Sequence, residues 1–181
     1  IPNRRVCNMY DMPVVKVAPR SQWAYQAEGI IVSSPAQSQG RAVVGDETGN
    51  VYCLDVATGK PLWTFKARNA VYSMPAIDNN RVIFGSCDSS IYCLNLTDGT
   101  KIWEHKTNHV VMGTPLIDGK AVYVGGSDGC YRALDVKNGK VKWEFCELTG
   151  YVESKPILYE DKLIFGAWDT YLYAVNPKNG K

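Results

Sequence analysis

The sequence lacks several patterns that mark common functional classes. Its six cysteines form no C-x-x-C pair, so zinc-ribbon and thioredoxin-type sites have no support. No apolar run approaches the roughly 20 residues of a membrane-spanning helix. A net charge of +2 over 181 residues is small for a nucleic-acid binder, which concentrates basic residues on one face. Walker, G-x-G-x-x-G and nucleophile–base–acid patterns are also absent. We therefore expect no nucleic-acid partner, no transmembrane segment and no catalytic residue.

Targeting information is missing as well. The chain begins at Ile1 rather than Met, and no signal peptide is visible. We expect either a processed product or a piece of a longer protein.

What the sequence does contain is a repeat with a period of about 40 residues, which is typical of helical HEAT or armadillo arrays and of β-propeller blades. Tryptophan recurs at this spacing, and proline and two glycine positions follow the same period, with one inserted residue before the last unit. The four series are Trp23, Trp63, Trp103 and Trp143; Pro35, Pro75, Pro115 and Pro156; Gly45, Gly85, Gly125 and Gly166; and Gly59, Gly99, Gly139 and Gly180.

The residues inside each unit favour the propeller. Short runs such as "RVIFG" and "SIYCLNL" are rich in β-branched and aromatic residues and are separated by tight-turn residues. No segment has a helical apolar period long enough for a helix. Each unit is therefore predicted to form four antiparallel strands: a Pro-containing strand, a Gly-ended strand, a "YCLD" strand and a Trp strand. The predicted fold is all-β, with four propeller blades in this chain.

The repeat resembles that of the pyrroloquinoline-quinone-like (PQQ-like) β-propellers and their tryptophan-docking motif. The resemblance is carried by Ala133-Leu134-Asp135, Asn138-Gly139 and Trp143, and by the matching residues of the other units. It covers about residues 20 to 181. It implies that the Trp of one blade packs on the small residue and the Gly of the next, so we assign Trp23, Trp63, Trp103 and Trp143 a structural docking role.

The resemblance leaves the function open. Such repeats occur in quinoprotein dehydrogenases, in outer-membrane assembly lipoproteins of the BamB type and in domains attached to other enzymes, and a fold does not establish a function. A quinone site would need an acidic Ca²⁺ ligand, a base, a cationic side chain and an aromatic floor, and no local motif signals one. The adjacent-cysteine pair of some quinoproteins is absent. No cofactor is expected, and PQQ with Ca²⁺ would apply only to a dehydrogenase fragment.

The cysteines are interpreted as small buried residues. Cys53 and Cys93 occupy the repeat position that holds Ala133 and Ala174 in the later units. All six cysteines are expected to be unpaired, which would favour a reducing compartment, whereas the family resemblance favours an extracytoplasmic location.

The predicted domain organisation fits either a propeller ring closed within this chain or part of a larger ring. Residues 1–19 are expected to be a linker or an extra strand, residues 20–26 a Trp strand, and residues 30–66, 70–106, 110–146 and 151–181 the blades. Ser21–Tyr25 would either complete the last blade and close a four-bladed ring, or belong to a larger ring of six to eight blades. In the larger ring, other blades or a homodimer of half-rings would cover the apolar end faces.

Candidate binding residues are those that the repeat does not require. They are expected in the loops 66–71, 106–111 and 146–152 and in the turns near 46–50, 86–90, 126–130 and 167–170. Trp168 is the one Trp of the sequence that does not follow the repeat. The candidates are Trp168 and five residues that begin the innermost strands and are expected to line the channel mouth: Tyr72, His109, Met112, Tyr151 and Glu153.

Two other groups of polar residues receive structural interpretations. Asp88, Asp128 and Asp169 recur at equivalent positions and are interpreted as turn-forming residues. His105 and His109 lie on a strand and in a loop, so a metal site is not assigned to them.

Three functions fit these observations. The first is a non-catalytic binding or scaffold module that meets a protein, peptide or glycan at its loop face. The second is an accessory propeller of a larger enzyme, such as a phosphoesterase. The third is a fragment of a PQQ-dependent quinoprotein dehydrogenase.

Overall fold

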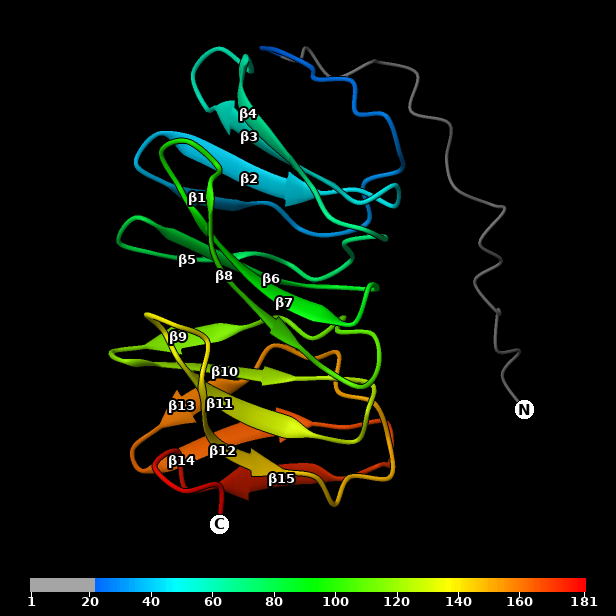
Figure 1. The fold of residues 1–181 in the computed structure, drawn as a ribbon, viewed down its shortest axis with the longest axis vertical. Helices are drawn as coiled ribbons and strands as arrows, with labels where there is room; N and C mark the ends of the chain where they lie inside the picture. The colour runs from blue at the N-terminus through cyan, green and yellow to red at the C-terminus, as the bar shows by residue number, and fades with distance from the viewer. Residues whose placement is uncertain (1–21) are drawn as a thin grey trace, which may run out of the picture.

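The computed structural model describes residues 22–181, which form four antiparallel β-sheets stacked in chain order (Figure 1). Each sheet is a meander of consecutive strands, and no helix occurs among the described residues. The strands are β1 (Ala36–Ser38), β2 (Arg41–Gly45), β3 (Asn50–Asp55) and β4 (Pro61–Lys66); β5 (Ala76–Asp78), β6 (Arg81–Ser86), β7 (Ser90–Asn95) and β8 (Lys101–Lys106); β9 (Leu116–Asp118), β10 (Ala121–Gly125), β11 (Tyr131–Asp135) and β12 (Val141–Phe145); and β13 (Ile157–Tyr159), β14 (Lys162–Gly166) and β15 (Leu172–Val175). The prediction of an all-β propeller-type fold is confirmed.

The core lies between the sheets rather than within any one of them. Side chains point alternately to the two faces of each strand. Val43, Val51 and Trp63 of the first sheet therefore face the second sheet, where they pack against Phe84 and Tyr92. Equivalent clusters join the second sheet to the third and the third to the fourth. A blade has two apolar faces and buries them only with neighbours on both sides.

Each repeating tryptophan lies against the turn glycine of the following unit. A Cβ atom added to Gly99 would lie 2.7 Å from Cδ2 of Trp63, and one added to Gly139 would lie 2.6 Å from Cε3 of Trp103. The indole N–H of Trp63 donates to the Leu96 carbonyl at 2.8 Å, and that of Trp103 to the Val136 carbonyl at 3.0 Å. These glycines have φ near +70°, so both the backbone and the ring exclude a side chain.

The innermost strand of each blade begins later than predicted. The expected Pro-containing strand starts after its proline, with Pro35, Pro75 and Pro115 directly before β1, β5 and β9. Proline has no N–H to donate to the sheet, so pairing begins at the next residue.

The predicted Trp strand at residues 20–26 is not formed. Residues 20 and 21 lie outside the described part of the chain, as does the predicted linker 1–19, and residues 22–26 pair with no strand. A strand requires an adjacent sheet edge, and the described residues place none beside this segment. The closed four-bladed ring is also not formed, because the first and last sheets lie at opposite ends of the stack (Figure 1).

The prediction that all cysteines are unpaired is wrong. Cys130 and Cys146 form a disulfide, with their Cα atoms 4.0 Å apart. They are brought together because Tyr131 of β11 pairs with Phe145 of β12, which places the flanking residues opposite each other. Cys53 and Cys93 are buried free thiols as expected, and burial raises their pKa values to about 11 and about 12.

The contact between Trp and Gly predicts a difference between two glycine substitutions. Gly139→Ala and Gly119→Ala both place a side chain at positive φ, which costs about 1–2 kcal/mol. At Gly119 no atom lies within 4 Å of the new Cβ, whereas at Gly139 the Trp103 ring must move. We expect Gly139→Ala to lower the free energy of unfolding by a further ~1–3 kcal/mol. The free energy of unfolding of both variants is measured by urea unfolding, followed by tryptophan fluorescence. Equal losses in the two variants would show that packing of the Trp103 ring does not depend on glycine at position 139.

Candidate functional site

The loops that link successive blades meet the turns of the next blade along one edge of the stack. The N–H of Cys87 donates to the Ala70 carbonyl at 2.8 Å, that of Ser127 to Val110 at 2.9 Å, and that of Trp168 to Tyr151 at 2.9 Å. Each of these bonds joins a loop after an outer strand to a turn between the second and third strands. We call this edge the loop face.

Three of the predicted binding residues form a row on the loop face. The rings of His109 and Tyr151 are nearly parallel, with centroids 6.5 Å apart, and the Tyr151 ring lies 6.5 Å from that of Trp168. All three side chains are exposed, Trp168 to 69%. We call His109, Tyr151 and Trp168 the aromatic row. It spans the loop after β8, the loop after β12 and the turn between β14 and β15.

Carboxylates anchor the turns beneath this face. Asp128 and Asp169 accept backbone N–H groups of their own turns, from Cys130 at 3.3 Å and Tyr171 at 3.2 Å. Asp88 instead accepts the N–H of Arg68 in the preceding loop at 3.0 Å and the hydroxyl of Tyr92 at 2.6 Å. The recurring aspartates therefore tie loops to turns, as well as shaping the turns.

In the first blade, a carboxylate at a different repeat position ties the preceding loop to the turn between the second and third strands. Asp46 is fully buried and accepts the Tyr52 hydroxyl at 2.8 Å, the N–H of Asn50 at 2.9 Å and the N–H of Gly29 at 3.1 Å. Burial raises its pKa, but the hydrogen bonds from Tyr52, Thr48 and Asn50 outweigh burial and lower the pKa of Asp46 to about 2. Its repeat equivalents are Ser86, Gly126 and Ala167, which is why the sequence pattern did not single it out.

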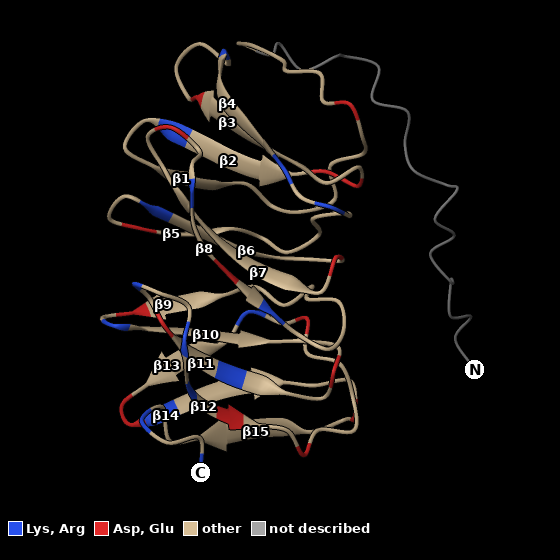
Figure 2. Cartoon of the chain, viewed as in Figure 1, with Lys and Arg blue, Asp and Glu red and all other residues tan. Residues whose placement is uncertain are grey.

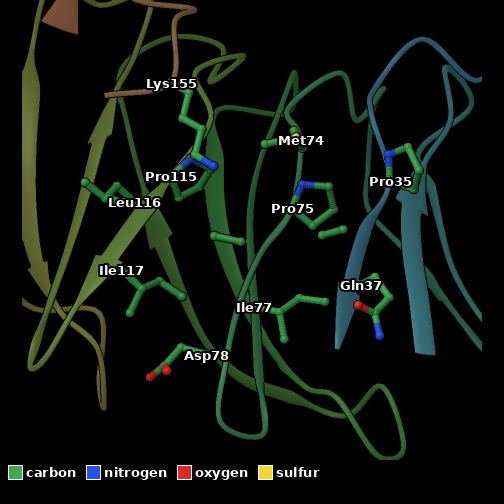
Figure 3. Close-up of a pocket in the computed structure, with 12 residues that line it drawn as sticks. Pro35, Gln37, Met74, Pro75, Ile77, Asp78, Pro115, Leu116, Ile117 and Lys155 are labelled. Carbon is green, nitrogen blue, oxygen red and sulfur yellow. The ribbon is translucent and has the colours of Figure 1, made fainter. Parts of the chain in front are cut away.

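The other three predicted residues lie in a groove along the innermost strands. Tyr72, Met112 and Glu153 line a cavity of about 540 Å³ together with Met74, Thr114, Lys155 and residues 32–34. A second cavity of about 390 Å³ continues it and shares Met74 and Lys155. Figure 3 shows this second cavity, with Pro35, Pro75 and Pro115 side by side on successive blades and Lys155 at one end. We call the two cavities together the inner groove.

The inner groove is built from two repeat positions, and sequence reasoning recognised one of them. Val32, Tyr72, Met112 and Glu153 are equivalent to one another, and so are Ser34, Met74, Thr114 and Lys155. Both positions vary completely between units, although the proline that follows is constant. A position that differs in every unit although it directly precedes the constant proline could have identified Met74 and Lys155 as residues of the groove.

The donor atoms of the groove do not fit a Ca²⁺-dependent quinone. Among the described residues, Glu153 is the one carboxylate of the larger cavity, and Asp78 the one carboxylate of the smaller. No group of three or more His, Cys, Asp or Glu side chains that could hold a metal ion occurs in residues 22–181. His105 lies on β8, where it pairs with Ile91 of β7, and His109 lies in the following loop; neither belongs to a metal-binding group among the described residues. We derive no reaction step through PQQ for this chain.

Both basic and acidic positions occur in or directly beside every sheet of the stack (Figure 2). Several are paired, including Arg68 with Glu104 at 2.6 Å and Arg132 with Glu144 at 2.7 Å. From residue 22 onward, no helix is long and apolar enough to cross a bilayer.

Comparison with known proteins gives one family and a set of similar folds. The sequence profile described as "Outer membrane protein assembly factor BamB" matches residues 14–144 and, in a second match, 90–181. The crystal structure of BamB from Moraxella catarrhalis is 24% identical, with a TM-score of 0.78, and the match covers 88% of this chain and 54% of BamB. No curated protein sequence matches.

Two further solved structures share the fold at lower identity. The computationally designed protein Ika4 is 17% identical with a TM-score of 0.75, and the match covers 83% of this chain and 93% of Ika4. The quinohemoprotein alcohol dehydrogenase ADHIIG from Pseudomonas putida HK5 is 16% identical with a TM-score of 0.74, and the match covers 87% of this chain and 34% of the dehydrogenase. The chain thus spans about half the length of the Moraxella BamB structure.

The low pKa of Asp46 predicts an acid-dependent loss of stability. A carboxylate whose pKa falls on folding stabilises the native state above its unfolded pKa of 3.8, and this contribution is lost as pH falls toward 2. A shift of this size corresponds to about 2 kcal/mol. We expect Asp46→Asn to be less stable than the unsubstituted protein at pH 7 by about this amount, and the difference to vanish near pH 2. Urea unfolding between pH 2 and 7 measures both, and parallel pH profiles would contradict the assignment to Asp46.

Proposed function

The chain belongs to the family of the outer membrane protein assembly factor BamB, and from this premise we propose that it is a non-catalytic scaffold that binds a protein partner at its loop face. The single observation that supports the proposal is the exposed aromatic row of His109, Tyr151 and Trp168. The repeat itself does not need these rings. The positions equivalent to Trp168 hold Glu47, Cys87 and Ser127.

The chemistry of the row suits a protein surface. Trp and Tyr supply large contact areas with few rotatable bonds, and they are enriched among the residues that dominate binding energy. The backbone hydrogen bond between Trp168 and Tyr151 holds the loop and the turn together, so little order must be gained on binding. The row runs over two loops and one turn of the loop face and offers its rings to one continuous segment of a partner.

The inner groove would extend this contact. Tyr151 and Glu153 are two residues apart, so the aromatic row and the groove adjoin at the last blade. Tyr72 and Met112 offer apolar contacts there, and Glu153 and Lys155 supply charges of both signs. A peptide segment of the partner would be held by these side chains, with the methionines of the groove adapting to its shape.

An extracytoplasmic location accompanies this proposal. The Cys130–Cys146 disulfide is the kind of bond that persists in oxidising compartments. The family description refers to assembly of outer membrane proteins, which takes place outside the cytoplasm. The likeness to quinohemoprotein dehydrogenases, at 16% identity, concerns the fold, and no observation on the loop face favours their chemistry.

The binding proposal predicts that loss of the row removes the partner. We expect Trp168→Ala and Tyr151→Ala each to weaken binding at least tenfold, about 1.4 kcal/mol, because each truncates an exposed anchor. Ile102→Ala is the matched control, since Ile102 is 45% exposed on β8, an outer strand away from the row. The unsubstituted protein and each variant are immobilised, and the proteins that each retains from a periplasmic extract are quantified. The affinity of each purified partner for each variant is then measured by calorimetric titration.

The outcome is decided by the pattern across the variants. A partner retained by the unsubstituted protein and by Ile102→Ala, but lost with Trp168→Ala, supports the assigned face. If every purified partner binds all four proteins with the same affinity, the loop face is not the binding surface.

A further inference from the structure

The outer hairpin of the third blade ends differently from those of the first two blades. Strands β7 and β8 of the second blade are paired up to Ser90 and Lys106, and the equivalent pair closes the first blade. Cys130 and Cys146 hold these positions in the third blade, but they lie just outside β11 and β12, and β12 ends at Phe145. The disulfide between the two cysteines takes the place of the backbone pair.

An inserted residue accounts for the loss of the backbone pair. In the second blade the residue directly after the last pair is Thr107, whose N–H donates to the Ser89 carbonyl at 3.0 Å. In the third blade the equivalent bond runs from the N–H of Leu148 to the Gly129 carbonyl at 3.2 Å. Glu147 precedes Leu148 and has no counterpart in the second blade, so it is the residue that lengthens this repeat. One extra residue on one strand of an antiparallel pair disrupts the ladder at that point.

The loop that follows, residues 147–152, makes longer backbone hydrogen bonds to its own blade than the equivalent loops do. The N–H of Val152 donates to the Gly126 carbonyl at 3.4 Å, whereas the equivalent bonds of Val71 and Val111 measure 2.9 and 3.0 Å. The usual range of such bonds is about 2.7–3.2 Å. The disulfide is therefore a covalent link at the base of a loop whose hydrogen bonds are weakened.

The same loop carries Tyr151 and lies directly against the turn that carries Trp168. The N–H of Trp168 donates to the Tyr151 carbonyl at 2.9 Å. A Cβ atom added to Gly150 would lie 2.6 Å from the carbonyl carbon of Trp168, so the two backbones are in contact. A shift of the loop therefore displaces two of the three rings of the aromatic row.

We propose that the Cys130–Cys146 disulfide is a redox-sensitive clamp that positions the aromatic row. In the oxidised chain the clamp keeps the end of β12 beside β11 in spite of the inserted residue, and it holds loop 147–152 against the turn of Trp168. Reduction frees the end of the strand, so the loop becomes mobile and the row loses its fixed geometry. The consequence for partner binding rests on the proposed function, whereas the change in the loop does not.

The clamp is accessible to a dithiol reductant, because Cys146 is exposed although Cys130 is buried. A thiolate of the dithiol attacks Sγ of Cys146, the bond between the two cysteine sulfurs breaks, and the Cys130 sulfur leaves as a thiolate that takes up a proton. The second thiol of the reductant then displaces the Cys146 sulfur. The chain gains two electrons and two protons, and the dithiol is oxidised to its disulfide. Among the described residues the other cysteines are free thiols, so this is the bond that responds.

Hydrogen exchange tests the clamp without any partner. The unsubstituted protein is compared in its oxidised form and after reduction by dithiothreitol, and amide exchange is measured residue by residue by NMR. We expect exchange in loop 147–152 and at Trp168 to become faster by about tenfold or more on reduction, because local opening no longer breaks a covalent link. Loops 66–71 and 106–111 are the internal control and should not change. Equal exchange in the two forms, or an equal rise in all three loops, would overturn the proposal.

A pair of variants separates positioning from a general loss of stability. Cys130→Ser with Cys146→Lys copies the second blade, where Nζ of Lys106 donates to the hydroxyl of Ser90 at 3.0 Å. This variant should exchange like the reduced chain, because the inserted residue still prevents the backbone pair. Deletion of Glu147 in the same variant restores the spacing of the second blade, so slow exchange of the loop should return. Fast exchange after the deletion would contradict the proposal, since the clamp would then not compensate for the inserted residue.

The affinity of a purified partner distinguishes this inference from the proposed function. If the partner binds at the aromatic row, reduction should weaken its binding by about tenfold, and the deletion variant should bind like the oxidised chain. Faster exchange of the loop with no change in affinity supports the clamp and refutes the loop face as the binding surface. Unchanged exchange refutes the clamp, and a loss of affinity with Trp168→Ala still supports the binding surface in that case.

Discussion

The contact of an indole ring with a glycine at the edge of the next sheet is the interaction on which this structure depends. The ring fills the space that any side chain at Gly99 or Gly139 would need, and its N–H is satisfied by a carbonyl of the same neighbouring blade. A blade of short strands cannot bury both of its faces alone. One large side chain per unit, placed at the junction, converts a row of marginal sheets into a continuous core.

Because that contact repeats, the positions that vary between units are free to carry function. The residues before each inner-strand proline change from Val32 to Tyr72, Met112 and Glu153 while the surrounding strand geometry is kept. The same holds for Trp168, which stands on a turn whose shape is held by Asp169 and Tyr173. The scaffold thus presents an aromatic row and a groove of mixed chemistry without a change in its internal packing.

In the first and last sheets of the stack, residues of the repeat lack some of the contacts that their equivalents make in the interior blades. Interior blades bury residues such as Ile91, and the last blade exposes its equivalent Leu172 for lack of a neighbour. The segment that begins with Trp23 shows that an outer strand can dock by its tryptophan before it has a strand to pair with. Docking of the Trp23 ring on the first sheet therefore does not require its backbone to pair with another strand.

The sequence by itself determined the blade, because alternation of apolar residues, turn chemistry and the period of the tryptophans are local or repeating signals. It also singled out Trp168, Tyr72, Met112 and Glu153 as residues that the repeat does not constrain. Only the tertiary structure decided which of these residues meet, that Cys130 reaches Cys146, and that residues 22–26 find no strand to pair with. Those facts depend on strand register and on which sheet lies beside which, and both are fixed by packing between units rather than by the composition of any one of them.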